Sequence, residues 1–384
     1  MKLTHAIEHL QKLIIAQTLA YERLVVESVK HNPWKYWSYV NSKLSNNNKN
    51  ISAIKTSDGT IEEPTSIAEA FSDFFYQCFN HDSRNISPSN LRSASSESYR
   101  PTHTVNKLCQ ISFDYRDVKC IIKSLPNKRS EDHNGFSYAI LKDCADILSY
   151  QLSRLFHLSF TTGQLPSDWK RGVILPIKKK TSAISVADYR PISITSCICR
   201  VFERLLRNRI ESFLEENELI SKSQHGFVKG RSTTTALLTY SNDISQSIDN
   251  GLCVDVAYFD FSKAFDSVRH DYLIEKLHKS GIQGPILTWI WNYIRNRVQV
   301  VNVNGYMSSE RSVSSGVIQG SVLGPILFII FVNDIDECIR SCSILKYADD
   351  IRIYRSFDSD IHSQQESGAL FQNDINTLVQ WVTK

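Results

Sequence analysis

Apolar residues recur at helical spacing in the first hundred residues of the chain. One such stretch lies within residues 1 to about 44, and a second, rich in phenylalanine, spans residues 67–79. Recurrence at every third and fourth position predicts amphipathic helices, and the polar Asn-rich and Ser-rich stretches that follow them predict linkers. We therefore expect a helical N-terminal extension over residues 1–100 and a main domain over residues 101–384.

The same spacing predicts four helices in the main domain. The longest covers residues 138–160 and is expected to end at Gly163, because glycine readily adopts the left-handed conformation that closes a helix. The other three are expected over residues 198–214, 233–248 and 271–280, the last capped by Asp271 and stopped by Gly281.

Short apolar or alternating runs between these helices predict strands. Residues 172–177 read GVILPI, which is typical of a buried strand, and residues 252–261 are strand-like as well. Residues 297–305 alternate and end in Asn-Gly, a strong signal for a β-hairpin turn. Strands separated by helices, together with hairpins, indicate an α+β domain.

Two carboxylates stand side by side in the stretch KYADDIRIY. A strand-like pattern runs into Tyr347 and another runs out after Asp350, so we expect a hairpin that carries Asp349 and Asp350 at its tip. Adjacent carboxylates repel each other and destabilise the fold unless a cation or a basic side chain lies close by. The pattern therefore predicts a positively charged partner at this tip.

Asp260 is a candidate third acid. It ends the strand-like segment 252–261, and a helical pattern resumes at Lys263, so its side chain can project into a cleft. A simple cap for the following helix is the competing interpretation of Asp260. Since a strand alternates its faces, Asp349 and Asp350 point in different directions unless the turn bends them together, and we expect Asp349 to be the principal ligand.

Three converging carboxylates predict a site for hard divalent cations. Mg²⁺ is the usual ion where phosphate groups supply further oxygen ligands. Two such ions, about 3.5–4 Å apart, can activate an attacking hydroxyl and stabilise the leaving oxygen of a phosphoryl displacement. The predicted chemistry is nucleotidyl transfer.

Composition and charge favour a large core and a polyanionic partner. With 384 residues, of which 42% are hydrophobic, we expect two or three structural regions. The net charge is only +4, but residues 170–231 hold 13 Lys and Arg against 6 Asp and Glu. A local excess of positive charge is typical of a surface that binds a polyanion. Solvated helix faces are the competing interpretation.

The nine cysteines and the apolar runs bear on the compartment. The cysteines lack the paired spacing of a zinc site, and we expect reduced, mostly buried thiols in an intracellular protein that is not secreted. Polar residues such as Glu8 and Lys12 interrupt the N-terminal apolar pattern, so no signal peptide is predicted. The longest apolar run, residues 326–332, is too short to span a bilayer, and no membrane partner is expected.

A family resemblance rests on six motifs in order. Three resemble the palm motifs of reverse transcriptases of non-LTR retrotransposons of the Jockey type: FDFSKAFD (259–266), SGVIQGSVLGP (315–325) and YADD (347–350). The resemblance extends upstream through LPSDWKRGVILPIKKK (165–180), DYRPISI (188–194) and SQHGFVKGRSTTTAL (223–237), and so covers roughly residues 118–376. It implies a right-hand polymerase fold with fingers and palm, and an RNA-directed DNA polymerase activity.

The resemblance also implies roles for single residues. Asp260 and Asp349 would match the metal-bridging carboxylates and Asp350 the third acid, holding two Mg²⁺ ions, with Mn²⁺ as an alternative. Phe265 would match the steric gate that excludes a ribose 2′-hydroxyl, although a core aromatic is the simpler interpretation of such a residue. Contacts with the incoming nucleotide would come from Gln319, Gly320, Lys178, Arg190 and Arg231, and contacts with the nucleic acid from Lys179 and Lys229. The implied partners are an RNA template, a DNA primer and deoxynucleoside triphosphates, while the oligomeric state is left open. The compartment that the resemblance implies is the nucleus or the cytoplasm.

The chain departs from the family pattern in three places. Ile318 stands where the family usually has proline, from which we expect a weakened but not abolished site. The segment SEDHNG (130–135) lacks the prolines of the matching family turn, from which we expect a less rigid loop. The sequence stops about where the family continues into the primer grip and thumb, so we expect a fragment of a larger element.

Two other interpretations compete with an active polymerase. The first is a catalytically silent remnant that still binds nucleic acid through its basic region; salt-sensitive RNA binding without extension would support it. The second is a related polymerase such as a group II intron maturase, which the Jockey-like sequences of the DFSKAFD and GSVLGP motifs disfavour.

Overall fold

The computed structural model describes residues 50–56, 59–79, 88 and 106–382, and short stretches between residues 16 and 40. Most of the first predicted helix, and both predicted linkers, lie outside the described residues. No helix in the described part of the chain is long and apolar enough to cross a membrane.

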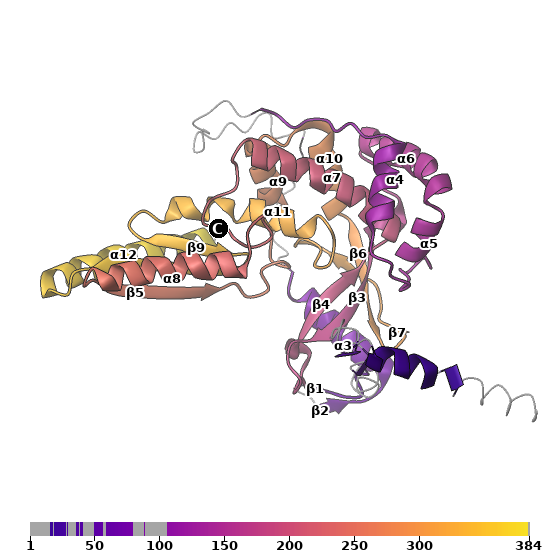
Figure 1. Cartoon of the computed structure of the whole chain (residues 1–384), viewed down its shortest axis with the longest axis horizontal. Coiled ribbons are helices and arrows are strands. Elements are labelled where there is room, and N and C mark those ends of the chain that lie inside the picture. Colours follow the sequence, from indigo (N-terminus) through magenta and orange to yellow (C-terminus); the bar gives the residue numbers. More distant parts are fainter. Residues whose placement is uncertain are drawn as a thin grey trace, which may run out of the picture.

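A three-stranded antiparallel sheet carries the predicted acids. Its strands, in spatial order, are β5 (Cys253–Asp260), β10 (Asp350–Phe357) and β9 (Ser343–Tyr347). Because side chains alternate along a strand, Ile351 and Ile353 face the main apolar core whereas Tyr354 faces the opposite side. The helix α8 (Thr233–Asp249) packs on that opposite side, and α12 (Ile361–Val382) packs against β10 (Figure 1).

A second sheet has five strands. They are β3 (Arg171–Lys178), β4 (Tyr189–Ile194), β6 (Arg297–Val303), β7 (Tyr306–Met307) and β8 (Arg311–Val313), in the order β4-β3-β6-β7 with β8 also paired to β6. The pair β3 and β6 is parallel and the others are antiparallel. The predicted Asn-Gly turn joins β6 to β7, where Asn304 and Gly305 both have positive φ. The strands predicted over 172–177, 252–261 and 297–305 are therefore confirmed.

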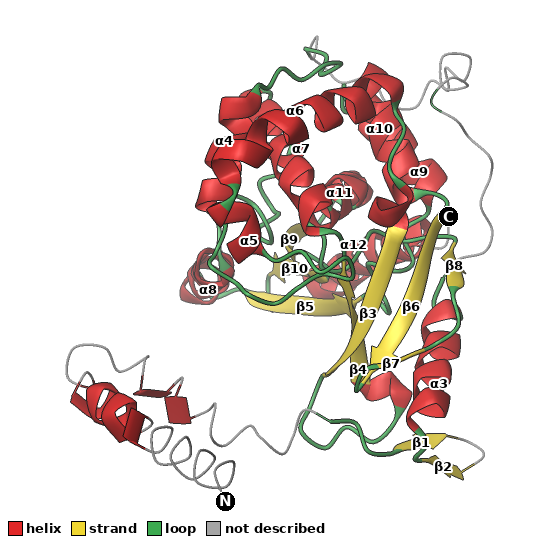
Figure 2. Ribbon diagram, turned by 90° about the vertical axis from the view of Figure 1, so that its right-hand side faces the viewer, coloured by secondary structure: helices red, strands yellow, loops and turns green. Residues whose placement is uncertain are grey.

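The helix α3 (Pro64–Tyr76) packs on this second sheet. Phe71 and Phe75 share an apolar cluster with Ile174 of β3 and Val301 of β6. The short hairpin of β1 (Ile54–Thr56) and β2 (Gly59–Ile61), which the sequence did not predict, lies beside them (Figure 2). The described part of the predicted extension thus shares a core with the sheet, and the predicted division near residue 101 stays a prediction.

The remaining helices gather above the second sheet around the largest apolar core (Figure 2). Aromatic rings form its centre, where Phe156 and Phe202 stack with centroids 4.8 Å apart and Trp289 meets Phe202 edge-on. These helices are α4 (Tyr115–Ser124), α5 (Tyr138–Asp143), α6 (Ala145–Thr162), α7 (Cys197–Glu216), α9 (His270–Lys279), α10 (Gly284–Ile294) and α11 (Gly324–Phe331); single turns of 3₁₀ helix cover Ser167–Lys170, Val186–Asp188 and Asn333–Cys338.

The helix predicted over residues 138–160 is two helices. Cys144 has φ −96° and ψ 10°, and it ends α5 and begins α6. A single non-helical residue hardly shifts the apolar spacing, so the sequence pattern runs through the break. The predicted end is confirmed, because Gly163 closes α6 with a φ of 69°.

The cap predicted for the helix over residues 271–280 is wrong. The helix α9 begins at His270, whose ring nitrogen Nε2 lies 2.8 Å from the carbonyl oxygen of Gly316. Asp271 therefore falls inside the first turn, where its carboxylate accepts a hydrogen bond of 2.8 Å from Arg269. The helices predicted over 198–214 and 233–248 are confirmed as α7 and α8.

The cysteines are free, as expected, but most of them are not buried. Only Cys197 and Cys199 are buried, whereas Cys120, Cys144 and Cys253 are exposed. Cys120 lies on α4, Cys144 at the break between α5 and α6, and Cys253 at the start of β5. The apolar character of cysteine does not show from the sequence that these three positions face solvent.

Candidate active site

The YADD stretch forms the predicted hairpin. Tyr347 ends β9 and Asp350 begins β10, so Ala348 and Asp349 make the two-residue turn between them. Ala348 has a φ of 57°, the left-handed conformation that a tight hairpin turn requires but that a residue with a Cβ adopts reluctantly. The acids stand at the tip, as predicted.

The strand register places Asp350 directly opposite Asp260. The two residues are partners in the β5–β10 ladder, at the end of β5 and the start of β10, and both are exposed. Side chains of direct cross-strand partners point to the same face, and like charges in this position destabilise a sheet. Among the described residues, no Lys or Arg forms an ion pair with either carboxylate, so their repulsion is not relieved locally.

Asp349 adds a third carboxylate to this pair. It is half-buried, and its burial raises the pKa of its carboxyl group above the usual value. The neighbouring carboxylates of Asp350 and Asp260 raise this pKa further, while Arg190 of β4 acts in the opposite direction. The Asp349 carboxyl group therefore lies within electrostatic reach of two other acids and of one guanidinium from the second sheet.

The donor set suits a hard divalent cation. Carboxylate oxygens are the preferred ligands of Mg²⁺, and a cation among these three acids would relieve the repulsion that raises the pKa of Asp349. The described residues contain no group of three or more His, Cys, Asp or Glu side chains already arranged to hold a metal ion. The fit therefore rests on the donor chemistry and on the charges.

A turn, not the predicted helix, follows Asp260. Residues 262–267 form successive turns in which Lys263 has a φ of 55° and its carbonyl accepts the N–H of Asp266 at 2.9 Å. The next helix begins only at His270. Because no helix starts beside Asp260, the capping role that competed with a functional role is excluded.

Phe265 lies in this turn, half-buried. Its ring stacks on Phe328 of α11 with centroids 4.6 Å apart, and Phe227 meets it edge-on at 6.3 Å. Its backbone carbonyl accepts the N–H of Val317 at 2.8 Å. The ring is thus held at a fixed position near the end of β5, and the sequence interpretation of a core aromatic on a helix is wrong about the helix.

The SGVIQGSVLGP loop connects the turn to the second sheet. Gly316 donates to Val268 at 2.7 Å, and a Cβ on Gly316 would lie 2.9 Å from the backbone of Asp266. On the other side, the carbonyl of Gln319 accepts the N–H of Ser193 at 2.8 Å, and Gly320 has a φ of 108°. Gln319 and Gly320 therefore lie against β4, the strand that carries Arg190.

Two residues of α7 that sequence reasoning missed support this loop. Glu203 is fully buried, and its Oε2 accepts the N–H groups of Val322 at 2.7 Å and Leu323 at 3.1 Å. Arg200 donates to the carbonyl of Gly320 at 3.1 Å. The signal in the sequence is a glutamate inside the apolar stripe of an amphipathic helix, because a buried carboxylate needs donors from elsewhere in the fold.

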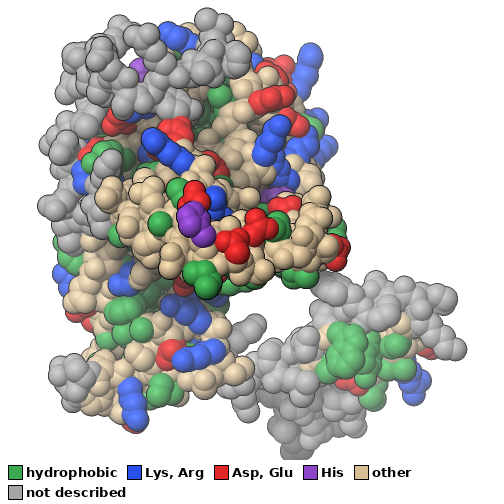
Figure 3. Space-filling view, turned by 90° about the vertical axis from the view of Figure 1, so that its left-hand side faces the viewer, with side chains coloured by type: hydrophobic (Ala, Val, Ile, Leu, Met, Phe, Trp, Pro, Cys, Tyr) green, Lys and Arg blue, Asp and Glu red, His purple; other side chains and the backbone are tan. Residues whose placement is uncertain are grey.

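The basic residues of the β3–β4 hairpin are partly engaged with their own backbone. Lys178 and Arg190 are exposed at the end of the hairpin that residues 179–188 close, and Arg190 acts on Asp349. Lys179 donates to the carbonyl of Ala187 at 2.9 Å, and Lys180 pairs with Asp188. On the face shown in Figure 3, Lys and Arg side chains are interspersed with Asp and Glu and do not gather into one basic patch.

The other two basic candidates hold their own loop. Arg231 donates through Nη1 to the carbonyl groups of Ser221 at 2.8 Å and Lys222 at 3.2 Å, and also to that of Gln224. Lys229 is exposed and lies 3.7 Å from a carboxylate oxygen of Glu215. Their contacts with a nucleotide or nucleic acid stay predictions.

Comparison with known proteins decides the family. Residues 177–384, more than half of the chain, match the family model of the reverse transcriptase, an RNA-dependent DNA polymerase. The chain belongs to the reverse transcriptase family, of the non-LTR retrotransposon type. The resemblance seen in the motifs is therefore confirmed.

Curated relatives of this reverse transcriptase come from Drosophila melanogaster. The chain is 29% identical over 303 residues to the probable RNA-directed DNA polymerase from transposon BS, covering 75% of this chain and 33% of that protein. It is 30% identical over 250 residues to the probable polymerase from transposon X-element, covering 64% and 27%, and 29% identical over 247 residues to the RNA-directed DNA polymerase from mobile element jockey, covering 62% and 27%. The chain thus spans a third or less of the length of these relatives.

All of the predicted site residues lie inside the range that matches the reverse transcriptase family. The match begins at residue 177, within β3, so α3 to α6 and most of β3 lie before it. These elements nevertheless share apolar clusters with the matched part, as Phe71 does with Val301 and Phe156 with Phe202. The fold that supports the acids is therefore larger than the matched range.

Proposed function

We propose that this chain is an RNA-directed DNA polymerase that adds deoxynucleotides to the 3′-hydroxyl of a primer on an RNA template and releases pyrophosphate. The observation that carries this proposal is the placement of Asp260 and Asp350 as direct strand partners with Asp349 at the adjoining turn. In this proposal the second sheet with α3 belongs to the fingers, and the three-stranded sheet belongs to the palm.

Asp260, Asp349 and Asp350 would hold two Mg²⁺ ions, with Mn²⁺ as an alternative. Bound there, the ions would lower the pKa of the primer hydroxyl and stabilise the leaving pyrophosphate. The chain's own contribution is a rigid frame: backbone ladder bonds fix Asp260 and Asp350, and the left-handed turn fixes Asp349. A frame that does not reorganise during the reaction is what electrostatic catalysis requires.

The remaining site residues would orient the nucleotide. Arg190, which already acts on Asp349, would bind the triphosphate through its planar guanidinium. Lys178 lies at the same end of the hairpin, but the register turns its side chain to the opposite face, so its contact with the nucleotide is the weaker part of this proposal. Phe265, fixed by its stack on Phe328, would stand below the sugar and exclude a 2′-hydroxyl. Gln319 and Gly320 would line the nucleotide on the β4 side.

Primer extension on an RNA template with deoxynucleotides and Mg²⁺ tests the proposal. We expect Asp350→Asn to lower extension on the order of 10³-fold, because metal-stabilised charge in the transition state is worth several kcal/mol. Asp358→Asn is the matched control: it removes an exposed aspartate outside the acid cluster and should leave extension unchanged. Equal extension by wild type and Asp350→Asn would contradict the proposal.

A silent nucleic-acid-binding protein is the second candidate. The observation that favours it is that the described acids are not already arranged as a metal-holding group. It would bind RNA in a salt-sensitive manner and yield no extended primer under any divalent cation.

A further inference from the structure

Residues 221–226 run along the free edge of β9, beside the acidic hairpin. The N–H of Lys346 donates to the carbonyl of Ser223, and the N–H of His225 donates to the carbonyl of Lys346, both at 2.8 Å. These bonds pair Gln224 with Lys346 in a single parallel bridge. The segment therefore extends the three-stranded sheet by a short fourth strand next to the turn.

Gln224 reaches from this segment into the turn itself. Its side chain is buried, with 1% of its surface exposed, and its Oε1 accepts two N–H groups, from Gly226 at 2.8 Å and from Ala348 at 2.9 Å. Two donors on one atom fix that atom as the oxygen. Ala348 is the turn residue with the left-handed φ, one position before Asp349.

Packing alone does not explain why residue 224 is a glutamine. Its Nε2 is buried among the described residues without a hydrogen-bond partner, which destabilises the folded state. An apolar side chain of similar length would fill the same space without that penalty. The contact that an apolar side chain cannot reproduce is the acceptor for Ala348.

The backbones of the loop and the turn touch directly. A Cβ added to Gly226 would lie 2.3 Å from the nitrogen of Ala348 and 2.9 Å from the carbonyl carbon of Tyr347. Nothing larger than glycine fits between them, so a shift of residues 224–226 is passed to the turn without a side chain to absorb it.

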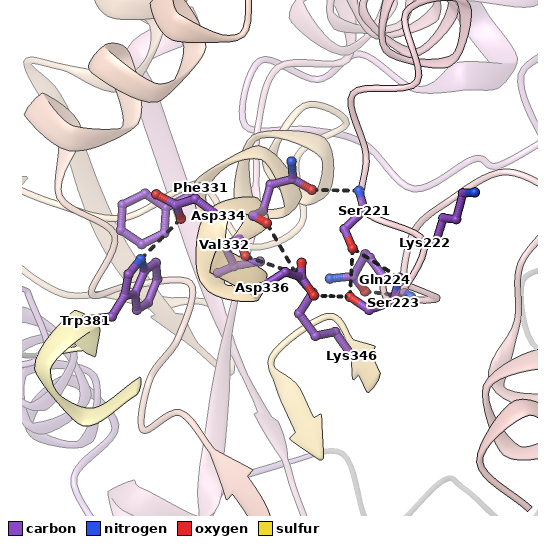
Figure 4. A network of polar contacts seen from close by, with 12 residues as sticks. Ser221, Lys222, Ser223, Gln224, Phe331, Val332, Asp334, Asp336, Lys346 and Trp381 are labelled. Atoms are coloured by element: carbon purple, nitrogen blue, oxygen red, sulfur yellow. Dashed lines mark hydrogen bonds and ion pairs between the residues drawn. The ribbon is translucent and has the colours of Figure 1, made fainter. Parts of the chain in front are cut away.

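A buried ion pair anchors the segment from the other side (Figure 4). Lys346 is fully buried and its Nζ bonds to Oδ2 of Asp336, while Oδ1 of Asp336 accepts the hydroxyl of Ser223 at 2.6 Å. The N–H of Ser221 also donates a hydrogen bond of 3.0 Å to Oδ1 of Asn333. The segment that carries Gln224 is therefore fixed before Gln224 reaches the turn.

We infer that Gln224 is a positioning residue, whose side-chain carbonyl holds the N–H of Ala348 and thereby fixes the Asp349 carboxylate relative to Asp260 and Asp350. The inference rests on the proposed polymerase function for its effect on catalysis. Without this acceptor the Ala348 N–H loses its partner, and the strained left-handed conformation of Ala348 loses a contact that holds it.

Three variants test the inference. Gln224→Met keeps the length of the side chain but removes the acceptor, and Gln224→Glu keeps the acceptor while adding a charge near three carboxylates. Gln299→Met is the matched control, because Gln299 of β6 is also buried with an unpartnered Nε2 but is not bonded to the turn.

The first readout is amide hydrogen exchange of the peptide that contains residues 347–350, which needs neither activity nor metal. We expect Gln224→Met to speed exchange at the turn about tenfold, while Gln224→Glu and Gln299→Met leave it close to wild type. Unchanged protection at the turn in Gln224→Met would overturn the inference, and so would an equal loss in Gln299→Met, which would indicate general loosening.

The second readout is the Mg²⁺ concentration for half-maximal primer extension, measured with kcat. We expect Gln224→Met to raise this concentration and lower kcat, each about tenfold, with partial recovery in Gln224→Glu. An active variant with wild-type Mg²⁺ dependence would overturn the inference. If the wild type extends no primer, the proposed function fails by itself, and hydrogen exchange at the turn still decides whether Gln224 fixes it.

Discussion

The two sheets of this chain differ in how their charged side chains are arranged. Around the five-stranded sheet, charged side chains pair across elements, as Arg311 does with Asp73 and Lys180 with Asp188. At the end of the three-stranded sheet, Asp260 and Asp350 face each other, and burial and repulsion raise the pKa of Asp349. A cluster of like charges lowers the stability of a sheet, and such departures from stability are typical of functional sites.

The three-stranded sheet offsets this repulsion with a buried frame. Beneath the acids lie the fully buried Lys346 with Asp336 and the buried Gln224, which tie the edge strand to neighbouring segments. Two exposed acids, Asp260 and Asp350, and the half-buried Asp349 thus stand on a rigid base. The variants below test each side of the comparison, from the largest expected effect to the smallest.

The largest effect on stability is expected from Asp336→Ala. This variant leaves the fully buried ammonium of Lys346 without its carboxylate, and breaking a buried pair in this way costs about 3–5 kcal/mol. Urea unfolding measures the loss. The double variant Lys346→Met, Asp336→Leu is the control: it should recover most of the stability, and failure to recover would show that the charge is not the cause.

Asp266, between the two sheets, should make stability depend on pH. Burial raises the pKa of its carboxyl group to about 6, with Lys263 acting in the opposite direction. Because this folded-state pKa lies above the unfolded value of about 3.9, the contribution of Asp266 is fully present below pH 4 and is lost as the pH rises to about 6.

Asp266→Asn should therefore remove this dependence. We expect the variant to be more stable than wild type at pH 7 by up to about 3 kcal/mol, with a flatter unfolding profile between pH 4 and 6. Urea unfolding across that range checks it. A profile that stays as steep as that of wild type would mean that another group titrates.

Gly320→Ala should loosen the contact between the SGVIQGSVLGP loop and the second sheet. Gly320 has a φ of 108°, and a Cβ there would lie 2.7 Å from the carbonyl oxygen of Ser193. Strain of this kind costs about 1–3 kcal/mol. Urea unfolding and primer extension should both report a decrease. Gly305→Ala is the control for backbone strain alone, since its Cβ would meet nothing within 4 Å.

The smallest effect is expected at the surface of the five-stranded sheet. Arg311→Ala removes the ion pair with Asp73. The side chain of Arg311 is 39% exposed and that of Asp73 is 55% exposed. Exposed pairs contribute about 0–1 kcal/mol, because water screens them. A loss as large as that in Asp336→Ala would erase the contrast between the two sheets.

The sequence predicted the exposed acids better than the frame beneath them. Alternation around Tyr347 and Asp350 was enough to predict the hairpin, because strand period and tip position are local properties. The same holds for the Asn304–Gly305 turn and for the end of α6 at Gly163. Local chemistry encodes these features within a few residues.

The features that the sequence did not predict depend on contacts between distant segments. The side chains of Gln224 and Glu203 accept hydrogen bonds from the N–H groups of Ala348 and Val322, which lie more than a hundred residues further along the chain. Their roles are therefore visible only in the folded structure. The helix predicted to resume at Lys263 is a series of turns instead, and Lys263 itself has a left-handed φ. Apolar periodicity reports which residues are buried, but it does not report which segments meet them.

The central claim is that the acids at the hairpin tip serve catalysis at the expense of stability, and Asp349→Asn tests it most directly. Primer extension and urea unfolding would be measured on the same preparation at pH 7. The account predicts that extension falls on the order of 10³-fold while the free energy of unfolding stays the same or rises, because one of three repelling carboxylates is gone. Retained extension, or a fall in the free energy of unfolding, would contradict the account.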